Sequence, residues 1–157
     1  MASDDPLPTR DFRDVEVCKV GVWHPFIGPP DWVVTDEYLA TLVANTRATA
    51  KRIPLKIGHN FEQALLVGDG LPDAGRFAPD SLRIEGGSLR ADLSLVPGKV
   101  GAVIEAGNWN SFSIETAYVD LPDGNVGEAI VAVALLGADL PAVSSLDEIV
   151  KRYARAR

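Results

Sequence analysis

Residues 112–136 read FSIETAYVDLPDGNVGEAIVAVALL, which is two strand patterns on either side of a turn. In the first pattern, residues 112–119, apolar side chains alternate with polar ones, which predicts a strand with one face in the core. The tetrapeptide PDGN has the composition of a tight turn. Residues 129–136 are apolar throughout and predict the most buried strand of the fold. The stretch therefore predicts a β-hairpin with one deeply buried arm.

The residues before this hairpin predict two further strands, a helix and a loop. Residues 15–23 alternate in polarity and indicate a strand, and residues 53–59 indicate a second, shorter one. Residues 36–51 carry apolar side chains at helical spacing, and Thr35 is a suitable N-cap for that helix. Residues 60–80 are rich in Gly and Pro without periodicity and are expected to form a loop.

Three more elements are expected around and after the loop. Residues 81–96 alternate in polarity on both sides of a Gly-Gly pair and predict a second hairpin. Pro97 is expected to open a short helix that Gly107 closes. Residues 145–157 begin with the capping-box sequence SLDE and predict a terminal amphipathic helix. Its apolar stripe is a candidate surface for a homo-oligomer, although packing on its own sheet is the default expectation.

Together these elements predict an α+β fold in one domain. The expected architecture is a mainly antiparallel sheet or barrel of about six strands with two or three flanking helices. Residues 1–14 are polar and are expected to be a flexible N-terminal lead-in to a single domain over residues 15–157.

The charge balance disfavours nucleic acid as a partner. The chain has 15 basic and 22 acidic residues and a formal net charge of −7. An acidic surface repels phosphate backbones, so we expect no nucleic-acid binding.

The cysteine content and the N-terminal sequence indicate the cellular compartment in which the protein is expected. Cys18 is the only cysteine, so no intrachain disulfide is possible and a reducing, intracellular compartment is expected. Cys18 itself lies in an alternating run typical of a half-buried strand. The N-terminus lacks an apolar signal-peptide core, and no apolar stretch reaches membrane-spanning length. The expected protein is soluble and has no membrane partner.

The scarcity of reactive residue types narrows the possible chemistry. With two histidines and one cysteine, the chain cannot build an ordinary zinc site from thiolate and imidazole alone. Neither a GxGxxG nor a Walker A phosphate loop is present. We therefore expect no metal and no cofactor. Serine hydrolysis remains possible, because it needs only a hydroxyl, an imidazole base and a group that orients the base.

The residues alone leave this possibility open. His24 lies in a turn-rich loop, whereas His59 follows Gly58 at the end of a strand pattern. Ser113 and Glu115 are two apart on one strand and share a face. These patterns are also typical of an ordinary strand-end histidine and of a half-solvated strand, and no GxSxG elbow is present.

A resemblance favours the catalytic interpretation. Segments in a characteristic order run over residues 35–143: TDEYL (35–39), PLKIGHN (54–60) with Gln63, DGLPDAG (69–75), LRADL (89–93), IEAGNW (104–109), FSIE (112–115) and VALLGADLPAV (133–143). In this order they resemble the Mu-like prohead proteases of tailed phages, a family related to the herpesvirus assemblins. The resemblance implies an assemblin-like β-barrel core with helices packed around it.

The resemblance also implies the site residues. The family's histidine falls on His59 as general base and its serine on Ser113 as nucleophile. Related phage enzymes use either an acid as third member or a Ser-His dyad, so the third member stays open. Glu115, beside Ser113 on the same strand face, is the preferred candidate, and Asp92 is the second. Backbone amides are expected to stabilise the oxyanion. The sequence does not identify them, and the Gly-rich turn at residues 73–75 is one candidate.

By the same resemblance, the chain is expected to be a capsid maturation protease. This serine endopeptidase would act in the host cytoplasm, inside immature proheads. Its substrates and partners would be the scaffold protein and the major capsid protein, and it would also cleave itself. The alternative is a non-catalytic capsid-assembly or scaffold module that retains the protease fold.

Overall fold

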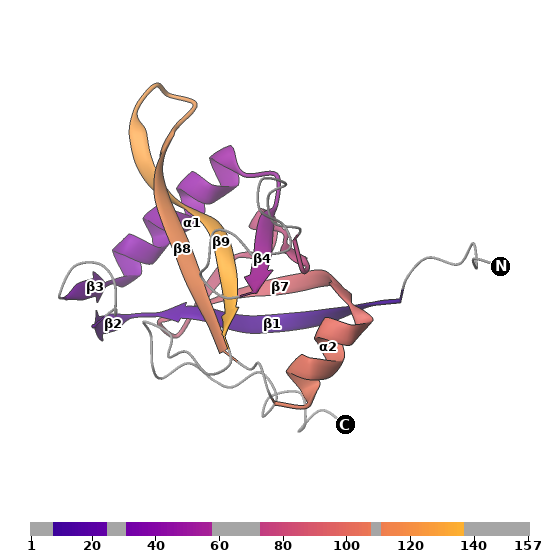
Figure 1. The fold of residues 1–157 in the computed structure, drawn as a ribbon. Helices are drawn as coiled ribbons and strands as arrows, with labels where there is room; N and C mark the ends of the chain where they lie inside the picture. The colour runs from indigo at the N-terminus through magenta and orange to yellow at the C-terminus, as the bar shows by residue number, and fades with distance from the viewer. Residues whose placement is uncertain (1–7, 25–30, 58–72, 108–110, 137–157) are drawn as a thin grey trace.

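A computed structural model describes residues 8–24, 31–57, 73–107 and 111–136 (Figure 1). The elements in chain order are β1 (Thr9–Lys19), β2 (Gly21–Trp23), β3 (Trp32–Val34), α1 (Asp36–Thr49), β4 (Ile53–Ile57), β5 (Arg76–Phe77), the 3-10 helix η2 (Pro79–Ser81), β6 (Arg83–Glu85), β7 (Ser88–Pro97), α2 (Gly98–Glu105), β8 (Ser111–Asp120) and β9 (Val126–Leu136). Four expectations fall wholly or partly outside the described residues: the start of the lead-in, the place of His59, the loop over 60–72 and the terminal helix over 145–157.

The main sheet is mixed and mostly antiparallel. Its strands follow the order β1-β7-β5-β4-β9-β8, and β6 pairs with β7 as the seventh strand. Each pair is antiparallel except β4 with β9, which are parallel. Strands β2 and β3 form a separate antiparallel ribbon. The predicted α+β class and mainly antiparallel sheet are confirmed, with seven strands where about six were expected.

The sheet bends strongly but does not close into a barrel. Strands β8 and β9 cross the direction of β1 and β7 steeply (Figure 1). The two end strands of the order, β1 and β8, pack against each other. In the described part of the chain no hydrogen-bonded ladder joins them, and a barrel requires such a ladder. Of the two forms expected, the structure is therefore the open sheet.

Several local predictions are confirmed by the backbone. The Thr35 hydroxyl caps α1 by accepting from the Tyr38 amide at 3.0 Å. Gly86 and Gly87 both have positive φ, 56° and 79°, as a two-residue type I′ turn between β6 and β7 requires. Gly107, with φ 85°, follows α2 at the position where the helix was expected to end. Neither helix among the described residues is long and apolar enough to cross a membrane.

The N-terminal lead-in was predicted too long. Strand β1 begins at Thr9, and Phe12 is 1% exposed in the core. The alternation is hidden because β1 contains register shifts on both sides of Phe12, and Asp14 adopts a positive φ of 57° between the paired residues. The strand expected over 15–23 is also divided, since the chain turns after Lys19 and continues as β2.

The expected loop over 60–80 contains regular structure in its last part. Strand β5 covers only Arg76–Phe77, yet it lies between β4 and β7 and joins them. Two residues are too short to show alternation, so the pattern gave no signal. The Phe77 side chain is fully buried and meets the Phe112 ring edge-on, with 6.0 Å between ring centroids.

Strand β9 is the most buried strand, as its composition predicted. Residues 132–136 are each 4% exposed or less. One edge of β9 pairs with β8 along its whole length, and the other pairs with β4 at only three residues, Val133 to Leu135. The remainder of that second edge needs other hydrogen-bond partners.

Helix α1 supplies these partners. The buried Thr46 hydroxyl accepts from the Ile130 amide at 2.9 Å. The Asn45 side-chain amide donates to the Glu128 carbonyl, also at 2.9 Å. Two consecutive helix residues thus take the place of a neighbouring strand where β4 does not reach.

We predict that Thr46→Val destabilises the fold by about 1–3 kcal/mol, because the shape is kept while the buried Ile130 amide loses its acceptor. Unfolding in urea at neutral pH measures the change. Thr49→Val is the matched control, since this exposed threonine bonds only within α1, to the Asn45 carbonyl. Its effect should stay within about 0.5 kcal/mol. Equal losses in both variants would indicate helix propensity rather than the bond to β9.

Candidate active site

Ser113 lies in a row of three residues that crosses three strands. On β8 it stands opposite Ala134 of β9, and Ala134 stands opposite Lys56 of β4. Residues directly opposite each other in neighbouring strands project from the same face of a sheet. Ser113 and Lys56 therefore share a face, with one alanine between them.

Glu115 lies on this face as well and binds Lys56. It is two residues beyond Ser113 and stands opposite Ala132. The Lys56 ammonium donates to both carboxylate oxygens, Nζ to Oε1 at 2.9 Å and Nζ to Oε2 at 3.2 Å. The lysine side chain reaches across β9, where the small side chains of Ala132 and Ala134 leave room. The side chains of Lys56 and Glu115 are only 12% and 17% exposed, so the pair is largely shielded from water.

Ser113 is more buried than its strand pattern indicated. Alternation placed Phe112 in the core and Ser113 on a solvated face. Phe112 is indeed 2% exposed, but Ser113 is only 7% exposed. At this point β8 is covered on both faces, so the serine hydroxyl lies in a sheltered setting beside a shielded ion pair.

His59 lies outside the described residues, so its distance from Ser113 stays untested. One described range ends at Ile57 of β4, two residues before His59 in the sequence. Ile57 stands opposite Leu135, and Leu135 stands opposite Phe112, the neighbour of Ser113. The end of β4 that leads to His59 is thus one row away from Ser113.

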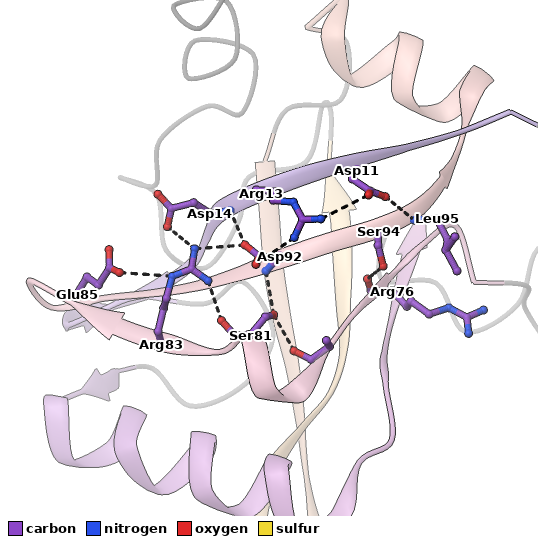
Figure 2. Close-up of polar contacts among 11 residues, drawn as sticks. Asp11, Arg13, Asp14, Arg76, Ser81, Arg83, Glu85, Asp92, Ser94 and Leu95 are labelled. Atoms are coloured by element: carbon purple, nitrogen blue, oxygen red, sulfur yellow. Dashed lines mark hydrogen bonds and ion pairs between the residues drawn. The ribbon is translucent and has the colours of Figure 1, made fainter.

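Asp92 belongs to a different cluster (Figure 2). Its carboxylate accepts from the Asp14 amide at 2.8 Å and from Arg83 Nη2 at 3.3 Å. Arg83 also pairs with the carboxylates of Asp14 and Glu85. In the sheet order β5, β4 and β9 separate β7, which carries Asp92, from β8, which carries Ser113. Of the two acids considered from the sequence, Glu115 is the one that shares a face with Ser113.

The surroundings of Asp92 stabilise its charged form. Partial burial raises the pKa of Asp92, but the hydrogen bond from the Asp14 amide and the charge of Arg83 outweigh it. The pKa of Asp92 therefore lies below its ordinary value. These contacts explain Asp92 as a structural carboxylate that holds the irregular part of β1 to β7.

One of the amides considered for an oxyanion site, that of Ala74, is engaged in the sheet. The Ala74 amide donates to the Leu55 carbonyl at 2.8 Å, and the Leu55 amide donates to the Gly75 carbonyl at 2.9 Å. The segment thus extends the pairing of β4 with β5. Because the Ala74 amide is bonded to the Leu55 carbonyl, it is not available as an oxyanion donor.

The two other reactive side chains considered have structural settings. Cys18 is fully buried, and burial raises the pKa of its thiol to about 12, so it stays protonated at neutral pH. The His24 ring is 74% exposed, with Nδ1 at 3.0 Å from an Asp31 carboxylate oxygen. In the described ranges no three side chains of metal-binding type converge on one point.

Lys56 is the site residue that sequence reasoning missed. It lies between Leu55 and Ile57 in a short apolar strand, and a charge in such a strand needs a partner. The need for a charged partner was the signal in the sequence that could have indicated Lys56. It could not identify Glu115, because the two residues are 59 positions apart.

Comparisons with known proteins add no relative: no family model, curated protein or solved structure matches the chain.

We predict a pH-dependent contribution of Asp92 to stability. Because its folded pKa is depressed, the stabilisation is present above the unfolded value near 3.9 and is lost as the pH falls through the folded value. The difference in unfolding free energy between wild type and Asp92→Asn should therefore shrink as the pH falls below about 4. Urea unfolding at a series of pH values measures it, with the exposed Asp80→Asn as control. A difference that stays constant over this pH range would contradict the assignment.

Proposed function

We propose that this chain is a serine endopeptidase of the prohead-protease type, with Ser113 as nucleophile and His59 as general base. One structural observation supports the proposal: Ser113 is sheltered on a sheet face beside the Lys56–Glu115 pair, one row from the end of β4. The ordered segments quoted above add the resemblance that names the reaction class.

The proposed reaction is acyl transfer in two halves. Neutral His59 takes the proton of the Ser113 hydroxyl as the oxygen attacks a peptide carbonyl, and the tetrahedral intermediate then expels the amine, which receives that proton. In the second half His59 takes a proton from a water molecule as its oxygen attacks the acyl-serine ester. The bond between the acyl carbon and Ser113 Oγ then breaks, the carboxylic acid product leaves, and His59 returns the proton to Ser113. Glu115 is the acid placed to assist, since it lies beside Ser113 on the same face.

The proposal extends to the fold and the setting. The bent, mainly antiparallel sheet is interpreted as an open variant of the assemblin-like barrel, since β1 and β8 pack together without pairing. The substrates are the scaffold protein and the major capsid protein inside an immature prohead in the host cytoplasm, and the protease cleaves itself as well. Confinement in a shell gives a high local substrate concentration, so modest intrinsic activity is sufficient.

One observation favours the second candidate, a non-catalytic capsid-assembly module. Ser113 is only 7% exposed. A nucleophile must be reached by a substrate carbonyl, and a purely structural serine need not be. Reaction of Ser113 with an external electrophile therefore distinguishes the two functions.

We predict that Ser113→Ala and His59→Ala each abolish cleavage when the chain is coexpressed with its own scaffold and capsid proteins. Each variant removes one partner of the proton transfer, so cleavage should fall by at least a factor of about 1,000. Gel analysis of the coexpressed proteins measures the products. A fluorophosphonate, which reacts with activated serines, should label wild type and fail to label Ser113→Ala.

Ser111→Ala is the matched control, because Ser111 lies two residues from Ser113 on the same face of β8. It should keep both cleavage and labelling. Cleavage by Ser113→Ala would refute the proposed nucleophile. Wild type that neither cleaves nor reacts would favour the assembly module.

A further inference from the structure

The Lys56–Glu115 pair has a geometry that backbone pairing fixes. Lys56 stands opposite Ala134 in the parallel β4–β9 ladder, and Glu115 stands opposite Ala132 in the antiparallel β8–β9 ladder. Both alanines are 4% exposed or less, so a larger side chain at either position would have little free space. The ammonium reaches the carboxylate only because β9 carries methyl groups at these two positions.

The ammonium holds the carboxylate in one orientation. Nζ lies 2.9 Å from one oxygen and 3.2 Å from the other, so a single donor group bridges both. Charge-assisted hydrogen bonds of this kind are stronger than neutral ones, and shielding from water strengthens them further. A shielded carboxylate without such a partner would either take up a proton or turn toward solvent.

The fixed orientation of the Glu115 carboxylate affects the expected reactivity of Ser113. The attack of a serine on a carbonyl builds negative charge on the former carbonyl oxygen, and an uncompensated carboxylate on the same face opposes that charge. Lys56 compensates the Glu115 charge at the place where the reaction would occur. It also keeps the carboxylate beside Ser113, where an acid can assist the base.

We propose that Lys56 is a positioning residue of the proposed Ser113 site and that it acts through Glu115. The inference rests on the proposed function, because it concerns the reactivity of that serine. Lys56 acts by holding the Glu115 carboxylate and does not itself exchange a proton with the substrate.

The test measures how fast Ser113 of the full chain reacts with a fluorophosphonate probe. Lys56→Met should slow labelling at least tenfold. Lys56→Arg should stay within about threefold of wild type, because a guanidinium can also bridge two carboxylate oxygens. Lys51→Met is the control for loss of a lysine charge, since Lys51 is exposed just before β4, and its rate should equal that of wild type.

A double-mutant cycle separates positioning from general loss of structure. If Lys56 acts through Glu115, Lys56→Met should change the rate by less than about twofold in a Glu115→Gln background. That comparison also serves if Lys56→Met alone does not fold, since the double variant contains no unpaired Glu115 carboxylate. Labelling rates are compared at a temperature where circular dichroism shows every variant folded.

The outcomes distinguish this inference from the proposed function. Wild type that is not labelled at Ser113 overturns both. Labelling of wild type at Ser113, with Lys56→Met reacting at the wild-type rate, overturns the positioning role alone. A tenfold loss that persists in the Glu115→Gln background also overturns it, because Lys56 would then act without Glu115.

Discussion

Three residue pairs between β4 and β9 connect the two halves of the sheet. Leu55, Lys56 and Ile57 pair in parallel with Val133, Ala134 and Leu135. On one side of this connection lie β5, β7 and β1, and on the other lies β8. The register decides which side chains face the candidate site, because a slip of one residue would place Leu55 or Ile57 on that face and turn Lys56 into the core. The position of Ser113 relative to Lys56 therefore depends on this short ladder more than on any contact of the serine itself.

The composition of β9 follows from the demands made on it. From Ala132 to Leu136 it is buried on both faces and must also leave space for the Lys56 side chain, and alternate alanines with large apolar residues meet both requirements. Its free edge would expose backbone groups, and α1 satisfies two of them with Asn45 and Thr46. Residues 129–136 have no polar side chain. Even so, Asn45 and Thr46 bond to the β9 backbone, and Lys56 reaches Glu115 across this strand.

Elements with a clear period could be predicted from the sequence, whereas contacts between distant segments could not. The α1 cap and both hairpins were predicted because their signals are local. Strand β5 was not predicted because two residues are too few to show alternation. The start of β1 was not predicted because its irregular register hides the alternation. Alternation correctly assigned Ser113 and Phe112 to opposite faces of β8, but it could not reveal that both faces are covered at this point. Glu115 was identified as a neighbour of Ser113 on one strand, whereas its partner Lys56 is 59 positions away. The place of His59 relative to these residues remains a prediction.

The sequence separation across the β4–β9 ladder sets an order for folding. The β6–β7 and β8–β9 hairpins connect neighbouring segments, so little chain entropy is lost in forming them. The β4–β9 ladder pairs Leu55 with Val133, which are far apart in the sequence, and long-range pairing of this kind forms late. During folding, the β8–β9 hairpin that carries Ser113 would therefore form before Lys56 is brought across β9. The site around Ser113 is then complete only in the finished fold, which would delay any reactivity of the serine until the chain has left its partly folded states.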